Sequence, residues 1–160
     1  AQSNGLGQAI RNANDGIGLI QTADGALEEY GDILNRIRTL AVQGANDTQD
    51  TASRTFIGKE MLRLQSELSH IAAETKFNGK QLLAATTTFV FQVGAYKGET
   101  TNTIISAATV AAAISAGGVI ATTADVDTQS EMASMIAYMD NSIKYIDTIR
   151  ANLTLQNTIY

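Results

Sequence analysis

Few side chains in this sequence could perform acid–base chemistry or bind a metal, and they are scattered. There is one histidine, His70, and no cysteine, so no thiolate nucleophile, thiolate metal site or disulfide can form. A lone histidine on a predicted helix is most often a surface or rim residue, because a catalytic or metal-binding role needs partners nearby. We therefore predict no metal site at His70.

Neighbouring carboxylates are the second possible source of chemistry. Asp24, Glu28 and Glu29 fall close together on a predicted helix, and paired carboxylates can act as an acid–base couple. On the polar side of a helix they are usually solvated charges, which is our interpretation. Gly16-x-Gly18 is not preceded by a strand, so a dinucleotide loop is not expected. The sequence predicts no enzyme and no cofactor.

The composition of the chain excludes several further classes of function. A chain of 160 residues with 44% hydrophobic and 17% charged residues can bury one core. The net charge of -5 argues against nucleic acid or an anionic membrane as partner, because both need a basic face. No apolar run reaches the ~18 residues of a membrane-spanning helix. The absence of proline suits long helices.

The longest predicted element is a helix over residues 6–45. Its apolar residues recur every three or four positions, which predicts a narrow, coiled-coil-like stripe. Glycines within it each cost about 1 kcal/mol relative to alanine, so this helix needs packing partners along its length. The predicted stripe consists of Ile10, Ala13, Ile17, Ile20, Ala23, Leu27, Tyr30, Leu34, Ile37 and Ala41.

Two further helices are predicted, over residues 51–75 and 128–157. Asp50 or Thr51 can cap the first, and Thr128 with Glu131 forms a capping box for the second. The predicted apolar stripes are Ile57, Met61, Leu64, Leu68 and Ile71, and then Met132, Ile136, Met139, Ile143, Ile146, Ile149 or Arg150, and Leu153. From their heptad spacing we expect one shared core containing Ile57, Leu64, Leu68, Ile136, Ile143 and Ile146.

Between these two helices the apolar period changes to that of a strand. Phe-Asn-Gly at residues 77–79 predicts a turn, and alternation followed by β-branched residues predicts a hairpin over residues 88–106. Residues 107–116 could form a short helix, and residues 119–126 a loop or a weak strand. The sequence thus predicts one mainly α domain over residues 1–160: an antiparallel bundle of three long helices with coiled-coil-like packing plus a β-hairpin appendage.

Several motifs in this order resemble bacterial flagellin. They include Arg-Asn-Ala-Asn-Asp-Gly at residues 11–16, the runs at 21–27 and 36–43, Phe-Asn-Gly at 77–79, Gln-Val-Gly-Ala at 92–95 and the helix at 143–153. The resemblance covers nearly the whole chain. It implies a structural subunit that self-assembles into the extracellular filament of the bacterial flagellum, with the flagellar export apparatus, an export chaperone and the filament cap as partners.

Two alternative functions stay open. A hook–filament junction protein has a related core, and a stand-alone helical binding module would use the same helices without assembling. The motifs at residues 11–16 and 92–95 favour flagellin.

The sequence also departs from the family pattern. The family's coiled-coil tails before Leu6 and after Tyr160 are absent from these residues, and only a short segment lies between Thr100 and Thr128, where most flagellins insert outer domains. The resemblance therefore implies a minimal flagellin, a trimmed core domain that we expect not to polymerise alone.

The candidate contact residues lie on the first two helices. Arg36 and Arg38 are either solvated charges with snorkelling stems or part of a recognition ridge with arginine as anchor. Arg36, Leu40 and Gln43 are spaced i, i+4 and i+7, so they share one helix face. The resemblance implies that these three, with Glu60, could be read by the flagellin-sensing toll-like receptor of vertebrates.

Two positions differ from the receptor-activating members of the family. Thr39 and Leu64 stand where many of those members carry Glu and Arg, so the resemblance implies weaker receptor binding. Leu64 also belongs to the predicted core, and the two assignments conflict.

Overall fold

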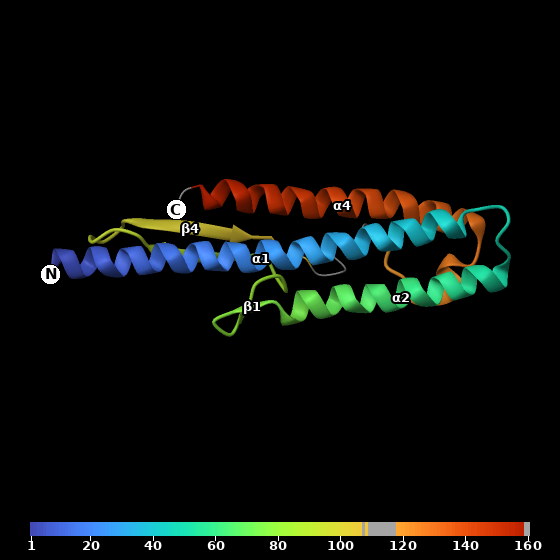
Figure 1. The fold of residues 1–160 in the computed structure, drawn as a ribbon, viewed down its shortest axis with the longest axis horizontal. Helices are drawn as coiled ribbons and strands as arrows, with labels where there is room; N and C mark the ends of the chain where they lie inside the picture. The colour runs from blue at the N-terminus through green and yellow to red at the C-terminus, as the bar shows by residue number, and fades with distance from the viewer. Residues whose placement is uncertain (107, 109–117, 159–160) are drawn as a thin grey trace.

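The chain forms an elongated rod in which one long helix, α1, lies between the other two, α2 and α4 (Figure 1). A computed structural model describes residues 1–106, 108 and 118–158. Both α2 and α4 run antiparallel to α1 and pack against it (Figure 1). The elements are α1 (Gln2–Gly44), α2 (Thr51–Glu74), β1 (Lys76–Phe77), β2 (Lys80–Gln81), β3 (Thr87–Gln92), β4 (Thr100–Ile105), η1 (Thr123–Val126) and α4 (Gln129–Asn157).

The N-termini of α2 and α4 are capped by the side chains that the sequence predicts, and the C-terminus of α1 is bonded by a side chain that was not predicted. The Asp50 carboxylate accepts a hydrogen bond from the backbone N–H of Ser53 at 2.8 Å, which caps α2. Thr128 and Glu131 form the predicted capping box of α4. Arg54 donates from Nε to the carbonyl of Gly44 at 2.8 Å, so it satisfies the last turn of α1.

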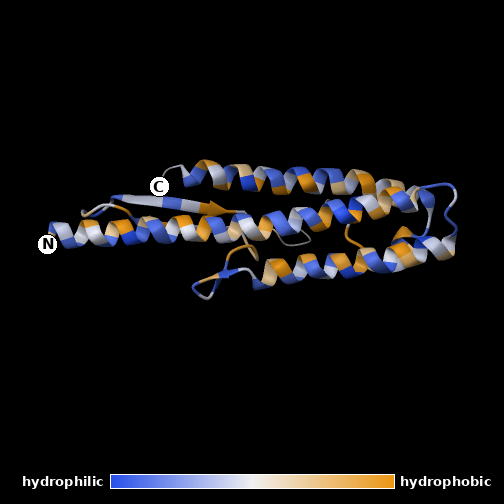
Figure 2. Cartoon of the chain, viewed as in Figure 1, coloured by the Kyte–Doolittle hydropathy of each residue, from blue (hydrophilic) through white to orange (hydrophobic). Residues whose placement is uncertain are grey.

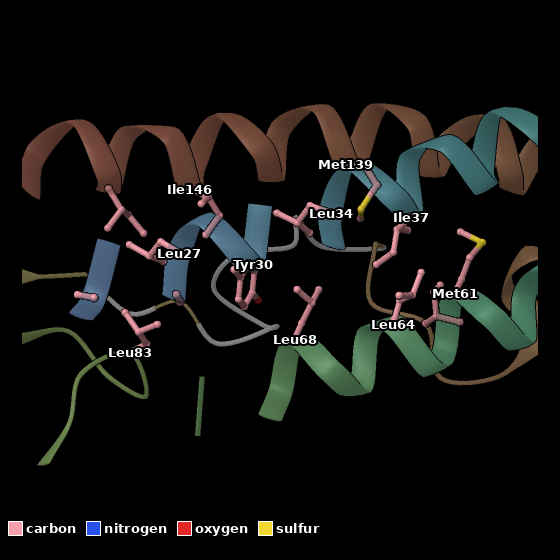
Figure 3. Close-up of a cluster of buried hydrophobic side chains, with 14 of the residues drawn as sticks. Leu27, Tyr30, Leu34, Ile37, Met61, Leu64, Leu68, Leu83, Met139 and Ile146 are labelled. Carbon is pink, nitrogen blue, oxygen red and sulfur yellow. The ribbon is translucent and has the colours of Figure 1, made fainter. Parts of the chain in front are cut away.

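The buried stripe of α1 is confirmed from Ile20 onward. Its side chains point toward residues of α2 and α4, as Figure 3 shows. Near the N-terminus the prediction is wrong, because Ile10 is 64% exposed and Ala13 and Ile17 are half-buried. Ala9 and Gly16 are buried instead. Ala9, Gly16 and Ala23 are seven residues apart, so small residues form the buried stripe, or seam, at this end of α1. The larger Ile10 and Ile17 each follow a buried residue and lie beside the seam.

The stripes of α2 and α4 need similar corrections. Ile57, Met61, Leu64 and Leu68 are buried as predicted, whereas Ile71 is half-buried and Ala72 takes its place. On α4, Met135 and Ser142 are buried, while Ile136 and Ile143 are only half-buried against the core. The expected core of six residues is therefore correct for four. Ser142 tolerates burial because its hydroxyl donates to the carbonyl of Tyr138 at 2.7 Å.

The β elements extend the predicted hairpin. β3 and β4 pair antiparallel with Thr87 opposite Ile105 and Gln92 opposite Thr100, which confirms a hairpin over this region. β1 and β2 form a second, shorter hairpin at a position where a turn alone is predicted. Its Asn78 and Gly79 have φ of 51° and 79°, as a two-residue hairpin loop of type I′ requires.

The remaining segment after the hairpin is described only in part. Residues 123–126 form the 3-10 helix η1, so the expectation of a loop or weak strand is wrong there. Asp125 stabilises this helix by accepting hydrogen bonds from the N–H groups of Ala121 and Thr122. The short helix predicted over residues 107–116 falls outside the described residues, apart from Ala108.

Two glutamine side chains attach the backbone of β4 and of the segment before η1 to the long helices, and we call them the glutamine clamps. Gln156 of α4 accepts from the N–H of Ile104 at 2.7 Å and donates to its carbonyl at 2.9 Å. Gln65 of α2 makes the same pair of bonds with Ile120, both at 2.8 Å. Each clamp satisfies one backbone donor and one acceptor that no strand partner reaches.

Apolar and polar residues alternate along all three long helices (Figure 2). This pattern is that of amphipathic helices that bury one stripe and leave the rest to water.

Leu68→Ala should destabilise the fold by about 2–5 kcal/mol, because Leu68 is fully buried between α1 and α2 and its loss leaves a cavity. Denaturant unfolding measures this change. Leu155→Ala is the control, because Leu155 is 69% exposed. A loss below about half a kcal/mol for Leu68→Ala, the size of an ordinary surface change, would contradict its place in the core.

Tyr30→Phe should leave stability unchanged or raise it by about 1 kcal/mol. Tyr30 is fully buried, and its hydroxyl has no hydrogen-bond partner among the described residues. Burial raises the pKa of this hydroxyl. Tyr30→Ala, by contrast, should cost about 3–5 kcal/mol through the cavity it leaves. Calorimetry of both variants separates the ring from the hydroxyl, and a marked loss in Tyr30→Phe would show that the hydroxyl is bonded.

Candidate functional site

The buried seam of α1 has two flanks, and the flank facing α4 is held by ion pairs. Arg38 Nε lies 2.6 Å from Asp140 Oδ1, and Asp24 Oδ1 lies 2.8 Å from Arg150 Nε. Gly31, midway between Arg38 and Asp24 along α1, faces Ile146. These three α1 positions are seven residues apart, so they follow the seam along one side.

The other flank faces α2 and carries most of the predicted contact residues. Ile33 and Leu40, seven residues apart, are half-buried and pack against the core. Outside them run Glu29, Arg36 and Gln43, again at steps of seven, all exposed. Arg36, Leu40 and Gln43 therefore share one flank, as their spacing predicts.

Glu60 lies opposite Arg36 on α2 within a small charge network. Arg63 donates to both carboxylate oxygens of Glu60, at 2.7 and 3.2 Å, and to Glu67 at 2.6 Å. The hydrogen bonds from Arg63 lower the pKa of Glu60, and the positive charge of Arg36 adds to this effect. The side chains of Arg63 and Glu60 are 56% and 33% exposed, so the pair fixes geometry more than it adds stability.

The structure separates Arg38 from the other candidates. Arg38 is the partner of Asp140 across the α1–α4 contact, whereas Arg36 influences Glu60 on α2. The predicted set of Arg36, Arg38, Leu40, Gln43 and Glu60 thus divides. We call the set without Arg38 the α1–α2 face, and in it Leu40 is half-buried and not an exposed apolar anchor.

The conflict over Leu64 is resolved in favour of the core. Leu64 is only 4% exposed and points toward α1 in Figure 3, so it offers no surface to a partner. Thr39 is exposed, and its hydroxyl donates to the carbonyl of Asn35 at 3.0 Å.

The remaining titratable candidates are structural or exposed. The prediction that Asp24 is a solvated charge is wrong, because Asp24 pairs with Arg150. Glu28 lies 4.0 Å from the same guanidinium. The hydrogen bond that Arg150 donates to the Asp24 carboxylate raises the pKa of Arg150. His70 is a surface residue with a side chain 77% exposed, and its Nδ1 lies 3.6 Å from Glu74.

A groove that was not predicted from the sequence lies between α1 and α2, beside the α1–α2 face. It has a volume of about 510 Å³ and is lined by Glu29, Asp32, Ile33, Glu67, His70 and Ile71. Its apolar part consists of Ile33 and Ile71, which pack on the core. The seven-residue step from Glu60 to Glu67 and Glu74 was a visible signal for an acidic line on α2.

The described residues contain no group of three His, Asp or Glu side chains placed to hold a metal ion. Among them there is also no helix long and apolar enough to cross a membrane. The fold and this surface define an elongated helical protein with two different flanks along its central helix.

Residues 1–88 match the family model for the bacterial flagellin N-terminal helical region. The chain therefore belongs to the bacterial flagellin family. The chain is 50% identical over 101 residues to flagellin B of Helicobacter pylori, which covers 62% of this chain and 20% of that protein. It is 48% identical over 99 residues to flagellin C of Vibrio cholerae, covering 61% and 26%. The chain thus spans only about a fifth to a quarter of these relatives.

Solved structures agree with this assignment. Bacillus cereus flagellin superimposes with a TM-score of 0.77 and 27% identity, covering 92% of this chain and 83% of that one. A candidate flagellar hook-associated protein of Vibrio parahaemolyticus superimposes with a TM-score of 0.70, covering 98% and 85%, but at 14% identity. The second likeness concerns the fold alone.

A double-mutant cycle on Asp24→Ala and Arg150→Ala should give a coupling energy of about 0.2–1 kcal/mol at low salt, because the pair is partly exposed. Added salt should weaken it. Unfolding free energies of the single and double variants measure the coupling. Arg11→Ala with Asp24→Ala is the control, since Arg11 bonds to Gln8 instead. Strict additivity in the Asp24–Arg150 cycle would contradict an energetic role for this pair.

Proposed function

We propose that this chain is the core of a structural subunit that self-assembles into the extracellular filament of the bacterial flagellum and serves motility. The match of residues 1–88 to the flagellin helical region carries the proposal. The matched residues form α1 and α2, the central helix of the rod and one of its two partners. The rod shape and its exposed flanks suit repeated side-by-side contacts.

A role without catalysis fits the same family match, because a filament subunit needs contact surfaces and no catalytic group. Secretion through the flagellar export apparatus, with an export chaperone and a filament cap as partners, follows from filament membership. The hook–filament junction alternative has less support, since the hook-associated likeness is limited to the fold at 14% identity, whereas flagellin B reaches 50%.

Elongation of filament seeds tests the proposal. The full-length native protein should extend sheared filaments in electron micrographs and sediment as polymer. A protein that stays monomeric over a concentration series, with and without seeds, would support a stand-alone binding module instead. Leu68→Ala weakens the core and leaves the surface unchanged, so it serves as the control for the effect of lost stability on elongation.

We further propose that the α1–α2 face is the region read by the vertebrate toll-like receptor that senses flagellin. Arg36 is exposed beside half-buried Leu40, with Gln43 one turn further and Glu60 opposite. An arginine over a partly buried apolar side chain is a common anchor of protein interfaces. Leu64 is buried and stands where many receptor-activating members carry Arg, so one polar contact is missing. Binding should therefore be weaker than that of strong activators.

Arg36→Ala should weaken receptor binding by the monomer about fivefold or more, the effect of losing an anchor worth over 1 kcal/mol. Arg38→Ala is a matched control, because it removes the same charge two residues away on the α4 flank. Surface plasmon resonance with the receptor ectodomain compares the two. Equal binding by both variants and the wild type would show that Arg36 is a solvated charge.

A further inference from the structure

The α1–α2 groove is chemically incomplete within one copy of the chain. Glu29 and Asp32 line it from α1, and neither carboxylate has an ion-pair partner among the described residues. Opposite them, Glu67 already binds Arg63. A floor of Ile33 and Ile71 beside two unpaired carboxylates suits an occupant with an apolar body and a cationic end.

The turn between β3 and β4 presents such a group. Tyr96 is 63% exposed, and Lys97 beside it is also exposed. The acidic residue of the turn, Glu99, is exposed but bonded within the turn, because its carboxylate accepts from the N–H of Tyr96 at 2.8 Å and its side chain lies against Gly94. The tip therefore offers an aromatic ring and a cation. Tyrosine is among the residues enriched as interface anchors.

The tip cannot reach the groove of its own copy. Ala95 packs beside Gly5 near the N-terminal end of α1, at the end of the rod that carries both termini (Figure 1). Glu29 lies 24 residues further along the same helix, about 36 Å at 1.5 Å per residue. The two complementary surfaces can meet only between copies.

We propose that the β3–β4 tip of one copy docks into the α1–α2 groove of a second copy, with Tyr96 over Ile33 and Ile71 and Lys97 between Glu29 and Asp32. This proposal rests on the proposed function and names one of its subunit contacts. The two surfaces are different and lie far apart along the rod. The contact is therefore heterologous, and each copy leaves one tip and one groove free for the next, which gives an open-ended stack.

Disulfide cross-linking tests the contact directly, because residues 1–160 contain no cysteine that could compete with introduced ones. Lys97→Cys and Asp32→Cys variants of the full-length native protein are mixed, assembled on seeds and oxidised. We expect a covalent dimer from the mixture and a ladder of oligomers from the double variant. Lys144→Cys mixed with Asp32→Cys is the matched control, since Lys144 is an exposed lysine on α4. Cross-linking no greater than in this control overturns the contact.

Charge reversal adds a second readout. Lys97→Glu should slow elongation about tenfold, and combination with Asp32→Lys should restore most of the rate, because the attraction is then rebuilt with opposite signs. Lys144→Glu should elongate at the wild-type rate. If Lys97→Glu matches wild type, or if Asp32→Lys fails to rescue it, the contact is wrong.

The wild-type protein in the same experiment separates the two levels of the proposal. A wild-type protein that does not elongate seeds overturns the proposed function and this contact together. Wild-type elongation without specific cross-linking overturns the contact alone and leaves the filament function standing. Specific cross-linking in elongating samples supports both.

Discussion

The buried seam on α1 is the contact on which the other elements depend. From Ile20 to Gly44 its residues follow steps of three and four and are almost entirely buried. In the described part of the chain α2 and α4 approach α1 but not each other. The packing of α1 must therefore offset both its own glycines and the entropy of ordering two further helices. Helix pairing around one central helix also explains why the molecule is a rod and not a compact globule.

Periodicity predicts the elements well because a helix requires it, but it cannot identify the residue that faces a partner. At Ala9, Gly16 and Ser142 a small residue occupies the seam while an isoleucine stands beside it. Hydrophobicity favours the larger side chain, whereas close approach of two helices favours the smaller one. Only the position of the second helix decides between them.

The candidate site likewise contains features that local sequence spacing predicts and features that depend on a second helix. The shared flank of Arg36, Leu40 and Gln43 follows from their local spacing and is present in the fold. The pairing of Arg38 with Asp140 joins residues 102 positions apart, and the groove needs residues from two helices at once. Neither could be obtained from local pattern. On the α4 flank, Arg38 and Asp24 of α1 form ion pairs within the chain. On the α2 flank, Glu29 and Asp32 have no ion-pair partner among the described residues.

The glutamine clamps have a consequence for how this core can evolve. Ile104 and Ile120 are each fixed by a side chain of a different helix, α4 and α2. Ile120 is buried, whereas Ile104 is 51% exposed, and each is held by a side chain of one of the long helices. Doubling the length of a connecting loop costs only about 0.6 kcal/mol of closure entropy. The clamps thus hold the chain to α4 at Ile104 and to α2 at Ile120. A change in the length of the loop between these two points should therefore cost the helical rod little stability.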